Sequence, residues 1–402
     1  MNAFPDRILI DARNDSIQLE QIAVDDLNEN LDRYLEPNWR AHRVLKGYQD
    51  FVRRGGQNDE ETYLQMRAAF SETRGRSNKI FSDVLASHTR KTNYDLSKSM
   101  FSGYVTGGKS DRAETTVSMV NGEDGEDPNA DLWAKVVHGA ARHLGMHGYW
   151  VSKFPAPDAL VQSLKKKTLA RLEGDHGAKI EAMIKGRDDA PGLIKGDARW
   201  LTTFEEMYEL SADPLLLSIV QAYMGLPPIF NTPVAFISSS AKPKNARELS
   251  DNAQLYHHDM HRLGFVKVFI YLTDVDDRSG PHTLVRGTHR NRPDPLWSDG
   301  RHDDAAIAKA GLTKDEVRIT GKAGTVFLVD TSALHKGLRP EAGHRIMAQV
   351  QYVNSLFGRP LAAADHKVET AQTSKREDIQ EAAALVRKYS ALAGVRFMQN
   401  MI

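Results

Sequence analysis

Two spacings of apolar residues divide this chain into a helical part and a strand-rich part. Over the first hundred residues, apolar positions recur every three or four residues, a period that predicts amphipathic helices. These positions include Val24, Leu27, Leu31, Tyr34, Val44, Tyr48, Phe51, Val52, Tyr63, Leu64 and Phe70. From Pro233 onward apolar and polar residues alternate instead, which predicts strands. We expect strands at 234–238, 254–259, 266–273, 283–285, 317–319, 325–329 and 345–353.

The strand-rich part predicts a closed β fold. Seven or eight short strands separated by turn residues are typical of a double-stranded β-helix of the jelly-roll or cupin-like type. The expected class is therefore α+β, with flanking helices and a mostly helical N-terminal extension over residues 1–130. That extension is either a scaffold packed on the core or an element for substrate recognition or dimerisation.

The expected barrel domain covers residues 131–402 and follows an acidic loop at 120–128. An insertion at 291–313 interrupts the strands and is long enough to act as a lid. A capping box at 374–377 predicts that the chain closes with a helix that packs back on the domain.

Composition removes several classes of function. Lys+Arg and Asp+Glu are equal at 53 each, so the net charge gives no reason to expect a nucleic acid or an anionic membrane as partner. The chain has no cysteine, which excludes disulfides, thiolate metal sites and a cysteine nucleophile. The first residues lack a signal-peptide pattern, and no apolar run approaches the roughly 20 residues needed to cross a bilayer. We therefore expect a cytoplasmic protein without a membrane partner.

Three side chains have the spacing of a metal site. His257 and Asp259 are separated by one residue, so on a strand they point to the same face while His258 points to the other. His335 follows the strand at 325–329, which the fold can bring alongside. Two imidazoles and one carboxylate are the ligand set of a non-haem Fe(II) site with open positions for substrate and dioxygen.

An arginine ten residues beyond His335 extends this interpretation. Arg345 opens the strand expected at 345–353. A buried guanidinium that faces the same cavity can bind a carboxylate through two hydrogen bonds, as the co-substrate 2-oxoglutarate requires. Arg339 lies closer to His335 in sequence and is the alternative for this role.

The chain resembles the phytanoyl-CoA dioxygenase family of Fe(II)/2-oxoglutarate oxygenases over roughly residues 145–358, about half its length. The ligand segments 254–262 and 329–337 carry the resemblance. Further segments follow in the family's order: Gly148–Val151, Ala156–Leu160, Asp213–Gly225, Phe269–Asp276, Ser279–Pro281 and Arg286–His289. The chain departs from the family at Arg286, where a proline is usual.

This resemblance implies an enzyme that uses Fe(II), 2-oxoglutarate and O2 and releases succinate and CO2. His257, Asp259 and His335 would hold the iron, and the presence of Asp259 points to oxygenation rather than halogenation. The expected reaction is hydroxylation of an unactivated C–H bond in a small molecule, with desaturation or ring formation as alternatives. A natural-product or glycan intermediate is the substrate suggested by the long extension and the insertion.

The resemblance also suggests residues around the metal. Thr325 is a candidate for supporting the co-substrate, and Phe269 or Tyr271 for the pocket wall beside it. His261, Arg262 and Arg286 are candidates for binding an anionic substrate at the entrance.

Two other functions remain as alternatives. One is a cupin-type metalloenzyme that does not use 2-oxoglutarate and has no need for Arg345. The other is a catalytically silent jelly-roll ligand-binding protein, whose signature would be the loss of a metal ligand. All three ligands are present in the sequence.

Overall fold

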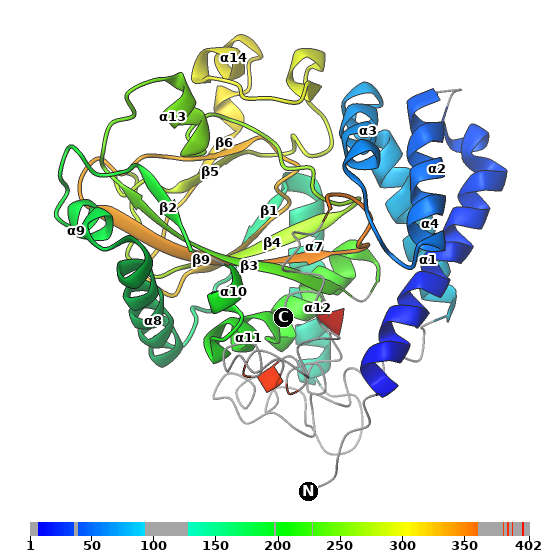
Figure 1. Ribbon diagram of the computed structural model, residues 1–402, viewed down its shortest axis with the longest axis horizontal. Helices are drawn as coiled ribbons and strands as arrows, with labels where there is room; N and C mark the ends of the chain where they lie inside the picture. Colours follow the sequence, from blue (N-terminus) through cyan, green and yellow to red (C-terminus); the bar gives the residue numbers. More distant parts are fainter. Residues whose placement is uncertain are drawn as a thin grey trace, which may run out of the picture.

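Helices and mostly antiparallel strands make up the computed structural model, whose elements Figure 1 labels. The structure describes residues 7–35, 39–92, 128–196, 198–226 and 228–360, with the single positions 381, 384, 385, 388, 396 and 397. The acidic loop expected at 120–128, except its last residue, and the capping box at 374–377 lie outside the described residues. So does most of the helix expected to follow that box.

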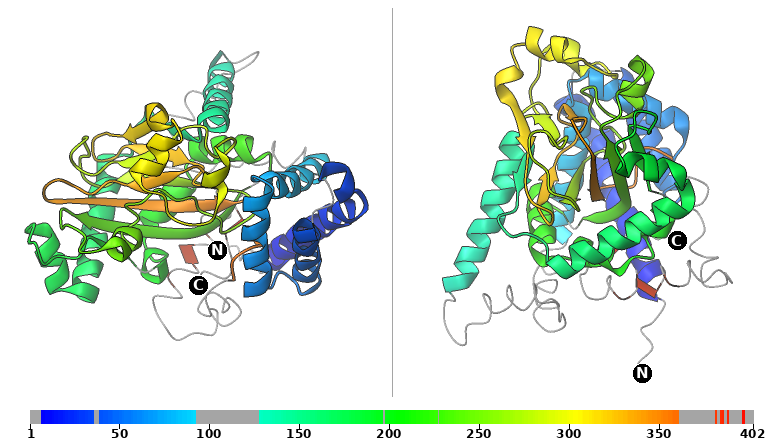
Figure 2. Two further views of the ribbon diagram at one scale, coloured as in Figure 1. Left: turned by 90° about the horizontal axis from the view of Figure 1, so that it is seen from above. Right: turned by 90° about the vertical axis from the view of Figure 1, so that its left-hand side faces the viewer.

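The N-terminal part is helical, as its apolar spacing predicts. Its helices are α1 (Arg7–Tyr34), α2 (Trp39–Arg53), α3 (Glu60–Glu72) and α4 (Arg76–Thr92). The Asp59 side chain caps α3 by accepting a hydrogen bond from the backbone N–H of Thr62 at 2.8 Å. Figures 1 and 2 show these helices together at one side of the sheets.

The N-terminal helices share a hydrophobic core with the strand-rich part. Apolar side chains of α1 to α4 form one cluster with residues far along the chain: Leu226, Met260, Leu263, Trp297 and Phe357. Burying an apolar side chain stabilises a fold by about 1.5–3 kcal/mol. This shared core is what the scaffold interpretation of the extension requires.

A second group of helices covers one face of the large sheet (Figure 1). It consists of α7 (Pro128–His147), α8 (Asp158–His176), α9 (Ala178–Ile184), α10 (Ala198–Leu201), α11 (Glu205–Ser211) and α12 (Pro214–Met224). Helix α12 begins at an Asp213 cap with Pro214 in its first turn and ends at Gly225, whose φ of 74° suits glycine. Among the helices that the structure describes, none combines the length and apolar character needed to cross a membrane.

Two sheets form the strand-rich part. The large sheet has the order β1-β7-β4-β9-β3-β10, with β2 also paired to β3, and the small sheet has the order β6-β5-β8. The large-sheet strands are β1 (Tyr149–Val151), β2 (Leu193–Lys195), β3 (Ile229–Ser239), β4 (Phe265–Tyr271), β7 (Val326–Val329), β9 (His344–Val353) and β10 (Arg396–Phe397). The small-sheet strands are β5 (His282–Val285), β6 (Glu316–Ile319) and β8 (His335–Gly337).

The alternation of side chains assigns a different environment to each face of the large sheet. On β4, Val268 and Ile270 pack with the helices, whereas Phe269 and Tyr271 pack with residues of the small sheet such as Leu284. We call the second face the inner face. The residues on the inner face therefore occupy alternate positions of each strand.

One expected strand is absent from this arrangement, while the other six correspond to observed strands. Residues 254–259 form two isolated bridges, Tyr256 with His302 and His257 with His335, instead of a continuous strand. This segment, which lies between α13 (Ala246–Asp251) and β4, thus pairs with two different partners over one residue each. The insertion at 291–313 contains η1 (Asp294–Trp297) and α14 (Asp304–Lys309), and η2 (Thr313–Asp315) begins at its last residue.

Candidate metal centre

Backbone hydrogen bonds bring the three predicted metal ligands together. The backbone N–H of His257 donates to the carbonyl of His335 at 3.0 Å, and the N–H of His335 donates back to His257 at 2.9 Å. The N–H of Asp259 donates to the carbonyl of Thr331 at 2.8 Å. These bonds attach the irregular ligand segment to the residues just before and within β8, so the triad does not depend on a continuous strand.

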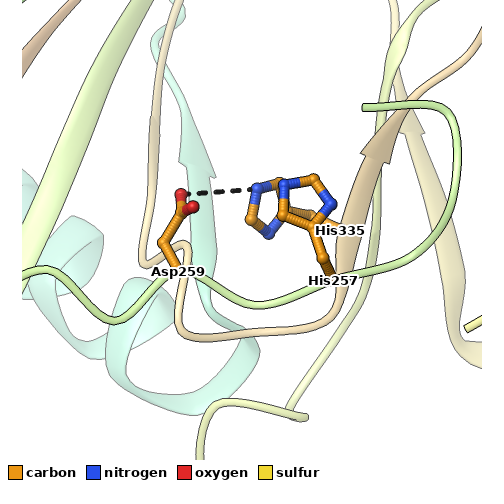
Figure 3. Close-up of side chains that lie close together, drawn as sticks. All are labelled: His257, Asp259 and His335. Atoms are coloured by element: carbon orange, nitrogen blue, oxygen red, sulfur yellow. Dashed lines mark ion pairs between the residues drawn. The ribbon is translucent and has the colours of Figure 1, made fainter. Parts of the chain in front are cut away.

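The three side chains converge on one point (Figure 3). One donor atom from each of His257, Asp259 and His335 lies within 4.8 Å of the others. The two imidazole rings have centroids 4.2 Å apart, and His335 Nε2 lies 3.6 Å from Asp259 Oδ2. Within the described residues, this is the group of three or more potential ligands that could hold a metal ion.

Both imidazoles are held in the tautomer that a metal requires. His257 Nδ1 lies 3.0 Å from the carbonyl oxygen of Leu255, and His335 Nδ1 lies 2.9 Å from that of Ala333. Because a carbonyl oxygen only accepts, each Nδ1 carries the hydrogen and each Nε2 keeps its lone pair. Metal-bound histidines typically make such a bond through the second ring nitrogen. The donor set therefore fits a divalent metal.

The electrostatics of the triad also favour a metal. Burial lowers the pKa of both His257 and His335, which keeps the imidazoles neutral. Burial by itself would raise the pKa of Asp259, but the Lys267 ammonium holds that pKa well below its usual range. Neutral imidazoles and an ionised carboxylate are the forms that bind metals.

The two other histidines of the segment 257–261 contact aromatic rings. The ring of His258 packs on Phe70 of α3, with centroids 5.4 Å apart, and burial lowers its pKa to about 3. This placement agrees with the preference for His257 as the ligand. His261 lies near Phe265, with ring centroids 6.3 Å apart, and burial lowers its pKa to about 4.

Arg345 is buried on the inner face of β9, with 3% of the residue exposed. Its Nη1 donates to the carbonyl of Gly280, and its Nη2 donates to Ser238 Oγ at 3.0 Å. Its Nε is buried without a hydrogen-bond partner. Arg339 differs, because it is only partly buried and its Nη1 donates to the backbone carbonyl of Ser240 at 2.6 Å.

Aromatic rings pack beside the triad. Phe269 stacks on Phe327 with centroids 5.1 Å apart, and His282 of β5 lies 4.8 Å from Phe269 and 5.6 Å from His335. The hydroxyl of Tyr271 donates to the carbonyl of Ile319 at 2.7 Å, so it is used within the core. Burial raises the pKa of Tyr271 to about 12.

Thr325 lies in the turn before β7, away from the triad. Its backbone carbonyl accepts from the N–H of Tyr271 at 3.0 Å, and a Cβ at Gly321 would meet its Oγ1 at 2.2 Å. Its side chain is partly buried. The structure thus places Thr325 at the end of the sheet where Tyr271 also ends.

Two of the residues expected at the substrate entrance are engaged elsewhere. Arg262 is 3% exposed, and its Nη1 donates to the backbone carbonyls of Arg359 and His261. Arg286 forms an ion pair with Asp315 at 3.0 Å. Both guanidinium groups thus have partners within the chain, and their role at the substrate entrance stays a prediction.

The sequence interpretation missed two polar residues at the site. Lys267 of β4 forms an ion pair with Asp259, with Nζ 2.6 Å from Oδ2. His282 is 4% exposed, and its Nε2 is buried without a partner. A signal for Lys267 was present, because it shares the alternating positions of Phe269 and Tyr271 within an otherwise apolar strand.

Comparison with known proteins gives one family. Residues 147–342 match the family model described as phytanoyl-CoA dioxygenase. No curated protein matches the chain.

Solved structures similar to part of the chain include the epimerase SnoN from nogalamycin biosynthesis (15% identity, TM-score 0.40, 55% of this chain and 84% of that chain). EctD from S. alaskensis with bound Fe is 19% identical, with a TM-score of 0.37 over 53% of this chain and 74% of that one. HygX from Streptomyces hygroscopicus with nickel and 2-oxoglutarate is 14% identical, with a TM-score of 0.40 over 56% and 89%. At these TM-scores the likenesses carry no argument for a substrate.

Proposed function

Because residues 147–342 place this chain in the phytanoyl-CoA dioxygenase family of non-haem iron and 2-oxoglutarate-dependent oxygenases, we propose that it hydroxylates an unactivated C–H bond of a small molecule. The observation that carries this proposal is the convergence of His257, Asp259 and His335, with both imidazoles in the tautomer that frees Nε2. Two nitrogens and one carboxylate are the ligands of an iron site with open positions.

Each residue of the site has a role in this proposal. His257, Asp259 and His335 hold Fe(II), and Arg345 binds the distal carboxylate of 2-oxoglutarate through its fork of donors. Iron with 2-oxoglutarate and O2 supplies the oxidising power and releases succinate and CO2. The chain's own residues bind and orient these groups and keep water out of the space between the sheets.

The aromatic residues complete the co-substrate pocket. Phe269 and Tyr271 line it on β4, where their rings pack with Phe327 at centroid distances of 5.1 and 5.0 Å. We assign Thr325 a supporting role at the same end of the sheet. Arg345 Nε and His282 Nε2 are buried without hydrogen-bond partners. Because buried polar atoms normally have partners, these two atoms support a pocket whose bound co-substrate would supply them.

The two sheets support a more specific fold. A large and a small sheet share a core cluster, and the segment with His257 bridges to His335 of the small sheet. We infer a double-stranded β-helix, with residues 1–130 as helical extension and 131–402 as oxygenase domain. The insertion at 291–313 is the proposed lid, and the cytoplasmic location remains a prediction.

The first test is to add Fe(II) and 2-oxoglutarate to metal-free protein under anaerobic conditions. We expect the visible charge-transfer band of the 2-oxoglutarate chelate to form, and to vanish in His335→Ala. His138→Ala, which changes an exposed histidine of α7, is the matched control and should keep the band. With the band established, candidate substrates are screened by the succinate that they release.

The same experiment separates the alternatives. Tight metal binding without the band, together with no 2-oxoglutarate affinity that Arg345→Ala could reduce, would favour a cupin-type metalloenzyme that does not use 2-oxoglutarate. The absence of metal binding would favour a silent jelly-roll ligand-binding protein.

A further inference from the structure

The metal site contains a buried cation that the proposed chemistry does not use. Lys267 points from the inner face of β4, and 10% of its side chain is exposed. Its Nζ donates to Asp259 Oδ2 at 2.6 Å. An ammonium group loses its hydration when it is buried, so removal of its partner is strongly destabilising. Lys267 therefore depends on a negative charge close to its present position.

Lys267 binds the carboxylate oxygen of Asp259 that lies nearest to His335. Asp259 Oδ2, which accepts from Lys267, is also the oxygen 3.6 Å from His335 Nε2. A metal ion held by the triad would approach the same oxygen. The ammonium and a divalent cation repel each other strongly at this range in a buried site. Metal binding should therefore displace Lys267 from Oδ2 and leave its charge in need of another anion.

A second cation lies beside the triad, on the insertion. Tyr256 and His302 exchange two backbone hydrogen bonds of 2.8 Å in an antiparallel bridge. In that register the next two residues, His257 and Arg301, are opposite each other. Opposite residues of an antiparallel pair share a face. The bridge thus directs Arg301 to the side of the segment on which His257 points.

The surroundings of Arg301 support this placement. Its side chain is exposed, so it can reach a bound molecule. Partial burial lowers the pKa of Arg301. The carboxylates of Asp259, Asp251 and Asp299 raise this pKa, and Asp259 has the largest effect of the three. The charge of Arg301 therefore interacts with the carboxylate of Asp259, a proposed metal ligand.

We propose that Lys267 and Arg301 bind an anionic group of the organic substrate, and that a metal ion at the triad releases Lys267 for this purpose. The substrate class is a small molecule that carries a carboxylate, phosphate or sulfate group. Lys267 is fixed on a core strand and Arg301 lies on the insertion, so the bound anion also holds the insertion over the site. The inference rests on the proposed function, because the triad must hold a metal.

Metal affinity tests the release of Lys267. Co(II) alone is titrated by calorimetry into metal-free wild type and Lys267→Met, which keeps the length of the side chain without its charge. We expect the variant to bind Co(II) at least about tenfold more tightly, because the competing cation is gone. Lys322→Met removes an exposed lysine that pairs with Asp274, and it should change nothing. Equal or weaker binding by Lys267→Met would overturn the proposal.

A fallback and a second variant keep the metal test decisive. If Lys267→Met does not fold, Lys267→Gln replaces it. Arg301→Gln should bind Co(II) only slightly more tightly than wild type, since its exposed charge is screened by solvent.

Anion binding tests the site itself. Sodium sulfate is titrated into protein loaded with Co(II) and 2-oxoglutarate, so that Arg345 is already occupied. We expect Lys267→Met and Arg301→Gln each to weaken sulfate binding about tenfold, as loss of one charge-assisted hydrogen bond does. Arg278→Gln, which removes an exposed arginine paired with Glu341, is the control and should bind like wild type.

The visible absorption of Co(II) identifies where sulfate binds. An unchanged d–d spectrum during the titration is the expected result, because the cation pair holds sulfate outside the metal's ligands. A shifted spectrum, or sulfate binding that both variants retain, means an adventitious ion only and overturns the proposal.

Failure of this inference is distinguishable from failure of the proposed function. If the Fe(II) and 2-oxoglutarate band forms but the sulfate results fail, the oxygenase assignment stands and the anion site is wrong. If that band does not form although Co(II) binds, the oxygenase assignment fails, and the metal titration of Lys267→Met still tests the competition.

Discussion

The two faces of the large sheet carry opposite chemistry on the same strands. On the face toward the helices, Ile270 of β4 and Val350 of β9 are fully buried and apolar. On the inner face, Lys267, Arg345 and Gln349 are buried to nearly the same degree but polar. Burying polar groups costs free energy unless they have partners. The face toward the helices is therefore apolar throughout this region, whereas the inner face combines an apolar cluster with buried polar groups next to the metal site.

The largest effect is expected when a metal ligand is removed from the small sheet, which packs on the inner face of the large sheet. In His335→Ala we expect Fe(II)-dependent activity to fall by more than about 1000-fold, since even the outer partners of metal ligands are worth about 10–100-fold. The melting temperature of the metal-free protein should change by only a few degrees, measured by calorimetry. A large loss of stability with activity retained in the folded fraction would reverse the assignment of the two faces.

The opposite face should respond in the opposite way. Leu328 of β7 is fully buried against the helices, so Leu328→Ala should lower the free energy of unfolding by about 2–5 kcal/mol. Urea unfolding measures this change. The folded fraction should still form the Fe(II) and 2-oxoglutarate band. Loss of the band from well-folded protein would contradict the claim that this face contributes to stability and not to the metal site.

Arg345 separates co-substrate binding from metal binding on the inner face. We expect Arg345→Ala to weaken 2-oxoglutarate binding by about 100-fold, because a buried bidentate contact is lost. Co(II) affinity without 2-oxoglutarate should stay within about twofold of wild type. Arg339→Ala is the matched control, and an equal loss there would move the carboxylate contact to Arg339.

The smallest effect is expected at the edge of the site. Thr325 is partly buried in a turn and offers one hydroxyl, so Thr325→Ala should weaken 2-oxoglutarate binding by only about fivefold. Thr325→Val, which keeps the shape without the hydroxyl, should reproduce this change. If the Thr325→Val variant bound 2-oxoglutarate as wild type does, the threonine would have only a packing role.

Several features could be predicted from local sequence alone. Alternation at 266–273, 325–329 and 345–353 predicts β4, β7 and β9 and identifies which residues share a face. The spacing of His257 and Asp259 predicts that these two side chains lie together, and in the structure they do, while His258 packs on Phe70. These features depend on periodicity within a few residues, which the sequence displays directly.

Other features depend on pairings between distant residues. Residues 254–259 alternate like a strand, yet they bridge to His302 on one side and His335 on the other. The ion pair of Lys267 with Asp259 and the engagement of Arg262 by Arg359 follow from the same long-range contacts. No local period encodes which segments meet.

The sequence by itself determined the helical and strand-rich parts and which residues of a strand share a face. The reason is that side-chain direction in a strand follows from backbone geometry, whatever the partner. Only the tertiary structure decided which distant residues lie beside the metal site, placing Lys267 on Asp259 and pairing His302 with Tyr256. A charged side chain takes the nearest available partner, and that partner is set by the packing of segments far apart in the chain.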